Sequence, residues 1–327
     1  MSKLNPINFK TQIGDADISI FFTCASFETR CFKVANILQD FSARKFIFYN
    51  ENESSEIKKN AYKLKESLKD SSLVALNSDR PVDNFLKIDS ILKELIDGLL
   101  AYPETEVSKP NILLDSTTFT HETLLVLVRL LAIKSEFLGH IYISYVGAQN
   151  YSTNTKSDDE KWLSKGIKEI RTVLGYGGIT DPTRKNHLLI LFGFESERTR
   201  KIIEEYEYDL ITLGFSNSPI LSSHQKINAR RHKDLIKEYP NAKEVEFSLI
   251  DPETTKKEIL EYLSGENYIN ANTVIAPLNN KLSTIGAGLA AIENQNIQIA
   301  YAKPNIYNIE GYSEACDDFY LLPLNFI

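Results

Sequence analysis

The 327-residue sequence has few cysteines and no long apolar run, and both shortages exclude classes of protein. Cys24, Cys31 and Cys316 form no C-x-x-C pair and are too few for a disulfide framework, so we expect reduced thiols. No apolar run reaches the roughly 18 residues of a membrane span, and the first residues are too polar for a signal peptide. These absences predict a cytoplasmic protein without membrane contact.

Sequence motifs for several common sites are also missing. The five histidines form no H-x-x-x-H or H-E-x-x-H pattern, so we expect no bound metal and no other cofactor. The sequence contains no G-x-x-x-x-G-K-[ST] and no G-x-S-x-G, which disfavours a P-loop nucleotidase and an α/β-hydrolase. Gly286 to Ala291 matches a dinucleotide fingerprint by letter. It lies inside a predicted helix, however, where it cannot form the tight turn that a pyrophosphate needs.

The charge balance is mildly acidic. The chain has 37 Lys and Arg against 44 Asp and Glu, a formal net charge of −7. This balance disfavours general binding to nucleic acid or to an anionic membrane, which would then require a local basic patch. Residues 226–233 include Arg230, Arg231, His232 and Lys233, but their helical spacing predicts a solvated face.

Short apolar runs rich in β-branched and aromatic residues recur along the chain, and most are followed by a helical pattern. The predicted strands are 18–23, 46–49, 112–114, 141–145, 188–192, 210–213, 245–247, 273–276 and 297–301. The predicted helices are 27–39, 54–69, 84–101, 119–134, 195–206, 224–238, 252–264 and 282–293. This alternation predicts an α/β protein with mostly parallel sheets covered on both faces.

The chain divides into two predicted halves. A predicted amphipathic helix carries Trp162, Ile167, Ile170, Val173 and Leu174, and a turn-rich segment follows it. We therefore place the boundary near residue 180. Residues 1–180 form a first Rossmann-like unit with a connecting helix, and residues 181–327 form a second such unit.

The two halves resemble each other. A strand followed by Phe27, Glu28 and Arg30 has a counterpart 167 positions later, where a strand is followed by Phe194, Glu195 and then Arg198. A second pair of loops, after Leu114 and after Ala276, lies 162 positions apart. Two displacements near half the chain length predict an internal duplication of the Rossmann-like unit.

The second of these loop pairs carries small polar side chains at the carboxyl ends of predicted strands, where open parallel sheets bind ligands. Asn279, Asn280, Lys281 and Ser283 lie at the start of a predicted helix. Exposed N–H groups there favour an anion such as phosphate by roughly 0.3 to 1 kcal/mol. The alternative is that the asparagine and serine only cap the helix while Lys281 points to water.

The first half has a similar loop, with Asp115, Ser116, Thr117 and Thr118 followed by His121. Asp115 is able to accept a hydrogen bond from a ribose hydroxyl, and His121 is able to donate to a phosphate or relay a proton. The alternative is an ordinary helix cap with a structural or solvent-facing histidine.

Carboxylates and guanidiniums also follow two predicted strands, as Glu28 with Arg30 and as Glu195 with Arg198. Arginine is suited to clamp a phosphate, while glutamate can hold that arginine or act as a general base. An ion pair that only stiffens the loop is the alternative. The tyrosine-rich segment 301–314 predicts a loop in which Lys303 and Tyr307 contact a ligand, or one packed on its own domain.

The loop Asn279-Asn280-Lys281-Leu282-Ser283 and its partner Asp115-Ser116-Thr117-Thr118 resemble those of the CRISPR-associated Rossmann-fold (CARF) sensors and their SAVED relatives. The family has glycines where this chain has asparagines before the lysine, and the first half has no lysine at that point. The resemblance implies a sensor that binds a cyclic oligonucleotide between two Rossmann-like units in prokaryotic antiviral defence.

Three functions stay open at this stage. The first is binding of a nucleotide or cyclic oligonucleotide between the halves, as a phosphorylated small-molecule partner. The second is hydrolysis of a phosphoester or N-glycosidic bond of a nucleotide, with Glu28 or Glu195 as general base, His121 as acid, and arginine and lysine stabilising charge. The third is a non-catalytic subunit of a defence complex that docks a protein partner or a second copy of the chain.

Overall fold

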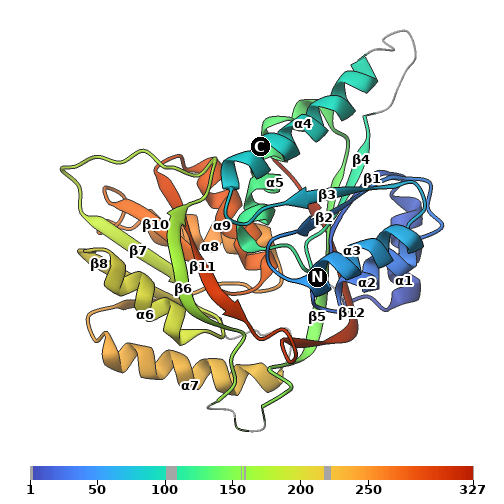
Figure 1. Cartoon of the computed structure of the whole chain (residues 1–327). Helices are drawn as coiled ribbons and strands as arrows, with labels where there is room; N and C mark the ends of the chain where they lie inside the picture. Colours follow the sequence, from blue (N-terminus) through green and yellow to red (C-terminus); the bar gives the residue numbers. More distant parts are fainter. Residues whose placement is uncertain (1–2, 101–108, 156, 158–159, 217–221, 327) are drawn as a thin grey trace. The chain divides into compact units, whose positions relative to one another are not determined.

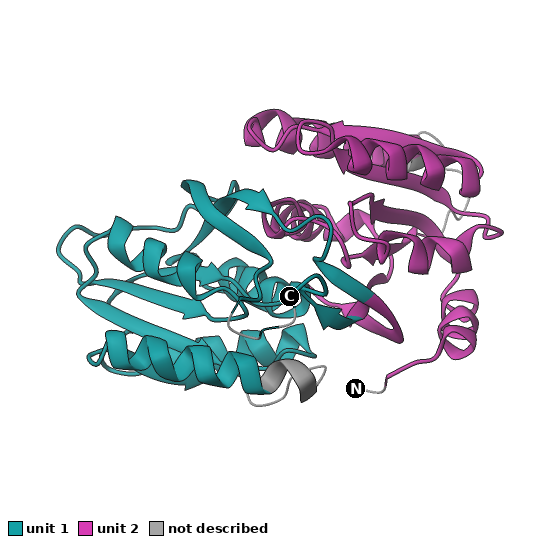
Figure 2. Cartoon of the chain, turned by 60° about the horizontal axis from the view of Figure 1, so that its bottom comes forward, with its two compact units in different colours: residues 1, 148–314 teal, residues 2–147, 315–327 magenta. Residues whose placement is uncertain are grey.

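The computed structural model describes residues 3–100, 109–155, 157, 160–216 and 222–326, and its contacts divide the chain into two compact units (Figure 2). Unit 1 comprises residues 148–314, and unit 2 comprises residues 2–147 together with 315–327. The boundary expected near residue 180 lies inside unit 1. The chain passes from one unit to the other within the strands Ile141–Tyr151 and Ser313–Leu324. The polar segments between predicted elements therefore do not mark the boundary between the units.

Unit 2 alternates strands and helices along most of its length. Its helices are α1 (Pro6–Asp15), α2 (Cys31–Leu38), α3 (Ser55–Ser67), α4 (Pro81–Leu100) and α5 (His121–Ile133), followed by the short 3-10 helix η1 (Ser135–Phe137). Its strands are β1 (Ile18–Cys24), β2 (Arg44–Asn50), β3 (Ser71–Leu76), β4 (Asn111–Asp115), β5 (Ile141–Tyr151) and β12 (Ser313–Leu324). Residue 101, where the helix predicted over residues 84–101 ends, lies outside the described residues.

The strands of unit 2 form one sheet in the order β12-β5-β4-β1-β2-β3. From β5 to β3, each neighbouring pair is parallel. Phe9, Val34 and Leu64 bring α1, α2 and α3 into one buried cluster on a face of this sheet. The helices α4 and α5 contact each other and cover the other face (Figure 1).

Unit 1 repeats the alternation. Its strands are β6 (Ser164–Thr172), β7 (Asn186–Leu191), β8 (Leu210–Phe215), β9 (Lys243–Glu246), β10 (Asn272–Pro277) and β11 (Ile297–Tyr307). Its helices are α6 (Ser196–Glu205), α7 (Ser222–Glu238), α8 (Pro252–Leu263) and α9 (Lys281–Glu293). In the ranges that the structure describes, no helix is long and apolar enough to cross a membrane.

The strands of unit 1 also form one sheet, in the order β6-β11-β10-β7-β8-β9. The five strands from β11 to β9 are parallel, and β6 is antiparallel to β11. The order equals that of the other sheet when β5, β4, β1, β2 and β3 are matched with β11, β10, β7, β8 and β9. The protein is therefore an α/β protein with two Rossmann-like units, as the sequence predicts. A duplication as the origin of this likeness stays a prediction.

The segment predicted as an amphipathic helix around Ile167 and Ile170 is the strand β6, so that prediction is wrong. Ile167 pairs with Pro304 and Ile170 with Ala302, while Lys303 pairs with Glu169. One residue of β6, Lys168, is therefore extra, as in a β-bulge. The bulge places two isoleucines three residues apart against the same core, a spacing that imitates one face of a helix.

The tyrosine-rich segment after residue 301 is also more regular than the loop that sequence analysis predicts. The strand β11 continues to Tyr307 and β12 begins at Ser313, so Lys303 and Tyr307 lie in a strand. Residues 300–307 pair with β6, which satisfies their backbone groups although the segment contains no apolar run. Sequence analysis likewise misses α1 and β3, in which few residues are buried.

Two helices, α5 after β4 and α9 after β10, begin where a polar side chain caps them. Thr120 accepts from the backbone N–H of Thr123 at the start of α5, and Asn280 accepts from that of Ser283 at the start of α9. Such a cap satisfies one of the N–H groups that a helix start leaves unpaired. Both capped ends lie at the carboxyl ends of strands, which is the edge of a parallel sheet where ligands bind.

Candidate functional site

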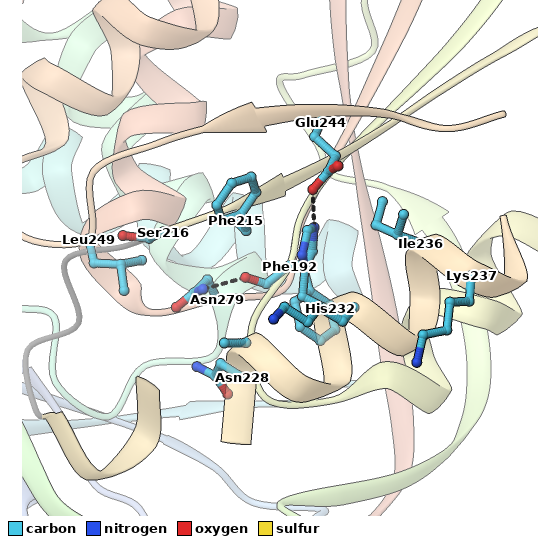
Figure 3. A pocket seen from close by; sticks show the side chains of 12 residues that line it. Phe192, Phe215, Ser216, Asn228, His232, Ile236, Lys237, Glu244, Leu249 and Asn279 are labelled. Carbon is cyan, nitrogen blue, oxygen red and sulfur yellow. Dashed lines mark hydrogen bonds and ion pairs between the residues drawn. The ribbon is translucent and has the colours of Figure 1, made fainter. Parts of the chain in front are cut away.

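Unit 1 contains a pocket of about 460 Å³ at the carboxyl ends of its central strands (Figure 3). The residues that line it are Phe192, Phe215, Ser216, Asn228, Ala229, His232, Lys233, Ile236, Lys237, Glu244, Leu249 and Asn279. Phe192 follows β7 and Asn279 follows β10, and the connections from these two adjacent strands lead to opposite sides of the sheet. The pocket therefore occupies the switch point at which open α/β sheets bind ligands.

Aromatic rings form one wall of this pocket. The ring centroids of Phe215 and His232 are 4.6 Å apart with an interplanar angle of 33°, and those of Phe192 and His232 are 6.1 Å apart. Phe192 is buried, whereas Phe215 is half-buried and lines the cavity. A flat aromatic wall of this kind is suited to stack a planar ligand ring.

His232 lies on α7 with only 6% of its surface exposed. Burial lowers its pKa, and the carboxylate of Glu244 opposes that shift. The ring is therefore neutral at pH 7. Its Nε2 lies 3.6 Å from Oε2 of Glu244, which is longer than a hydrogen bond, and Figure 3 shows the two side chains facing each other. No hydrogen-bond partner of Nε2 is present in the described ranges.

A second polar atom at this pocket is also unsatisfied. Oδ1 of Asn228 is buried and has no hydrogen-bond partner among the residues that the structure describes. Asn228 precedes His232 by four residues on α7, so both side chains lie on one face of that helix. A buried acceptor without a donor costs about 1–3 kcal/mol, which a ligand carrying a donor would offset.

The loops after β7 and β10 touch at the floor of the pocket. Asn279 donates from Nδ2 to the backbone carbonyl of Phe192. A Cβ atom on Gly193 would lie 2.5 Å from the carbonyl oxygen of Leu278, so only glycine fits at this contact. The asparagine that sequence analysis selects as a ligand-binding residue thus lines the pocket and also joins its two loops.

The other predicted residues of this loop start the helix α9. Asn280 donates from Nδ2 to the carbonyl of Leu249 at 2.7 Å and accepts from the backbone N–H of Ser283 at 2.9 Å. The Ser283 hydroxyl is buried and donates to the carbonyl of Asn280. Lys281 is the first residue of α9 and is half-buried. Asn280 and Ser283 therefore act at the start of the helix, as in the alternative in which they only cap it, and they do not line the pocket.

In unit 2, the predicted loop Asp115 to Thr118 is buried and bonded to its own sheet. Ser116 donates to the carbonyl of Ser144 at 2.8 Å, and Thr118 donates to that of Cys24 at 2.6 Å. Asp115 accepts from the hydroxyls of Thr117 at 2.5 Å and Thr23 at 3.1 Å. Burial raises the pKa of Asp115 to about 6, although these hydrogen bonds oppose the shift.

The two glutamate–arginine pairs are ion pairs in the structure. Nη2 of Arg30 lies 2.6 Å from Oε2 of Glu28, and both side chains are buried. Nη1 of Arg198 lies 2.9 Å from Oε2 of Glu195, with about a tenth of each side chain exposed. Each arginine also donates to a backbone carbonyl of its own sheet, at Val146 and Ala302. This geometry matches the ion-pair alternative, in which the pair stiffens the loop.

The remaining predicted residues are not among those that line this pocket. His121 is the first residue of α5 and is partly exposed. Lys303 is buried in β11, where it stands opposite Glu169 of β6. Tyr307 ends β11, and its ring centroid is 6.2 Å from that of Tyr312.

Most of the residues that line the pocket are not predicted from the sequence. The helical spacing of residues 226–233 predicts a solvated face, but His232 is buried, and Arg231 donates to the carbonyls of Phe194 at 2.5 Å and Lys161 at 2.7 Å. That interpretation is wrong for these two residues because α7 packs this face on the sheet. Leu235 follows His232 by three residues and is fully buried, a helical spacing that marks the buried face.

The described residues contain no group of three or more histidine, cysteine, aspartate or glutamate side chains that could hold a metal ion. The sequence of the chain matches no protein-family profile and no curated protein sequence. The class of protein is accordingly defined by the fold and the pocket: an α/β protein with two Rossmann-like units and an aromatic-walled pocket at the switch point of one sheet.

Proposed function

We propose that the protein binds a nucleotide in the pocket of unit 1. The observation that carries the proposal is the position of this pocket at the carboxyl ends of the strands, over the point where the loops that follow β7 and β10 meet. Its volume of about 460 Å³ is within the range of small-molecule sites, roughly 300 to 1,000 Å³. The half-buried ring of Phe215 supplies a surface on which a nucleobase stacks.

Positive charge near the pocket suits the phosphate of such a ligand. Lys233 and Lys237 are exposed and line the rim on α7. The helix α9 begins two residues after Asn279, and the partial positive charge at a helix start attracts an anion. These groups supply locally the positive field that a net charge of −7 denies to the protein as a whole.

The proposal is narrower than the functions that the sequence leaves open. A cyclic oligonucleotide as the nucleotide, a site between the two units and a role in antiviral defence rest on the resemblance to CARF and SAVED sensors and stay predictions. Hydrolysis with Glu28 or Glu195 as general base also stays a prediction, and in the structure both carboxylates are held by arginine. Docking of a protein partner or of a second copy stays a prediction as well.

The proposal is tested by filling the pocket. Ala229 is exposed and lines the cavity, so Ala229→Trp places a large ring there without disturbing the core. Asp234→Trp on the same helix is the control, because Asp234 is exposed and does not line the pocket. Protein purified from its native host is denatured, the released small molecules are identified by mass spectrometry, and binding of nucleotides to the emptied protein is measured by calorimetry.

A nucleotide that is released from the parent and the Asp234→Trp variant, but not from Ala229→Trp, is the expected result. Calorimetry should show the same pattern, with binding to Ala229→Trp at least about tenfold weaker. Equal binding to all three proteins would move the site elsewhere, and absence of any nucleotide binding would overturn the proposed function.

A further inference from the structure

Two buried polar atoms at the pocket of unit 1 have no hydrogen bond in the part of the chain that the structure describes. They are Nε2 of His232 and Oδ1 of Asn228. Most buried polar groups in proteins are hydrogen-bonded, so an unsatisfied group at a cavity points to a ligand that completes it. The chemical identity of these atoms and of their neighbours then indicates which ligand groups fit.

His232 and Glu244 together present a donor beside two acceptors. The carboxylate of Glu244 lies 3.6 Å from Nε2, and about half of its side chain is exposed at the pocket. A neutral imidazole carries its proton on one nitrogen, and a carboxylate this close favours the tautomer with the proton on Nε2. Neighbouring positions on the pocket wall therefore offer one N–H donor and then two carboxylate oxygens.

The four common nucleobases differ in the order of donors and acceptors on their Watson–Crick edges. Guanine presents an acceptor, O6, followed by two donors, N1–H and the N2 amine. Adenine and cytosine present an amine next to a ring acceptor, and uracil has one donor between two acceptors. A donor followed by two acceptors complements only guanine. A carboxylate that accepts two parallel N–H groups also makes the strongest kind of hydrogen-bonded contact.

We propose that the pocket recognises guanine, with Nε2–H of His232 donating to O6 and the carboxylate of Glu244 accepting from N1–H and the N2 amine. The inference rests on the proposed nucleotide-binding function and adds the base. The ring of Phe215, which contacts the ring of His232 at a tilt of 33°, lies beside these groups and supplies the apolar surface for the base. Oδ1 of Asn228, one helical turn from His232, accepts from a ribose hydroxyl of the same ligand.

The test is calorimetric titration of the full chain with GMP, IMP, AMP, CMP and UMP. GMP should bind roughly 100-fold more tightly than AMP, CMP and UMP, because a mismatched edge leaves the carboxylate and the imidazole unpaired. IMP has the same edge without the N2 amine, so its affinity should be about tenfold below that of GMP.

Two variants assign the recognition to the named residues. Glu244→Gln replaces one acceptor with a donor, and His232→Phe keeps a ring but removes the N–H. Each should reduce the preference for GMP over AMP to less than about tenfold. Glu205→Gln is the matched control for Glu244→Gln, because Glu205 is an exposed carboxylate of unit 1 that lies outside the pocket. It should keep the full preference.

The outcomes separate the two proposals. Tight binding of all five nucleotides with equal affinity, or a preference for AMP, CMP or UMP, would overturn guanine recognition and leave nucleotide binding intact. A preference for GMP that survives both variants would overturn the assignment to His232 and Glu244. If none of the five binds and none raises the melting temperature, the proposed function fails, and base recognition fails with it.

Discussion

Arg30 donates a hydrogen bond from Nη1 to the backbone carbonyl of Val146, 3.0 Å away and 116 residues later in the chain. Val146 is the sixth residue of β5. In the other unit, Arg198 donates in the same way to Ala302, which is the sixth residue of β11. Each arginine is also paired with a glutamate of its own loop. The short similarity between the two halves of the sequence thus corresponds to one repeated contact, in which the loop after a central strand is tied to the strand two places away.

Removal of one partner of the buried pair should destabilise unit 2. Arg30→Met removes the arginine that pairs with the buried carboxylate of Glu28, at a cost of about 3–5 kcal/mol in the free energy of unfolding. Glu28→Gln together with Arg30→Met should be less destabilising than Arg30→Met alone, since no buried charge remains. Urea denaturation followed by circular dichroism measures both. The control is Arg80→Met, because Arg80 and Asp83 form an exposed pair worth less than about 1 kcal/mol. An equal loss of unfolding free energy in Arg30→Met and in Arg80→Met would contradict the prediction.

Asp115 should make unit 2 less stable as the pH rises. Burial raises its pKa from 3.8 to about 6, so the folded state keeps a proton that the unfolded state releases. The contribution of Asp115 to the free energy of unfolding is fully present below pH 3.8. It is lost as the pH rises from 3.8 to about 6, a change of about 3 kcal/mol. Asp115→Asn should remove this dependence. Urea denaturation of both proteins at pH 4 and pH 7 measures it, and an unchanged difference between the two pH values in the variant would refute the assignment.

His187 should have the opposite effect in unit 1. Its ring is fully buried between the hydroxyls of Thr273, at 3.2 Å, and Thr212, at 2.9 Å, and burial lowers its pKa from 6.5 to about 4. As the pH falls, His187 therefore binds a proton in the unfolded state before it does so in the folded state. Its contribution to the free energy of unfolding is lost between pH 6.5 and about 4, by roughly 3 kcal/mol. His187→Phe should flatten this slope. The single tryptophan, Trp162, lies in unit 1, so its fluorescence reports the unfolding of this unit. A slope that is unchanged in the variant would contradict the prediction.

Gly286 should be required for the packing of α8 on α9. A Cβ atom there would lie 2.5 Å from Cβ of Thr255 and 2.8 Å from the carbonyl oxygen of Pro252. Gly286→Ala should therefore cost about 1–3 kcal/mol by forcing the two helices apart. Gly14→Ala is the control, because nothing lies within 4 Å of the added atom, and alanine favours a helix more than glycine does. Thermal unfolding measures both variants, and a Gly286→Ala protein as stable as the parent would show that the helices adjust freely.

The sequence predicts the central strands and their helices because these segments carry the apolar and helical patterns of a covered parallel sheet. Leu188 to Leu191 is one such run, and all four of its residues are fully buried. The pattern fails at the edges. Residues 164–172 become the strand β6 because β11 pairs with them and a bulge accommodates the spacing of Ile167 and Ile170. Partners from distant parts of the chain therefore decide the structure of the edge strands.

The candidate site shows the same division. Sequence analysis finds Asn279, because an asparagine after a strand and before a helix marks the ligand-binding edge of a sheet. It does not find His232 or Glu244, whose positions in the sequence carry no mark of a site. These two side chains face each other only because α7 packs on the sheet and β9 lies beside β8. The sequence also selects Ser116 and Thr117, as polar residues after a predicted strand, and the fold buries both.

The sequence by itself determined the fold class and the alternation of strands and helices, because both depend on residues that are close in the chain. Tertiary structure alone decided which buried polar groups have a hydrogen-bond partner within the described part of the protein and which do not. Arg30 finds a carbonyl partner 116 residues away, whereas Nε2 of His232 and Oδ1 of Asn228 find none among the described residues. Burial and hydrogen bonding depend on what packs around a group in three dimensions, and local sequence spacing does not contain that information.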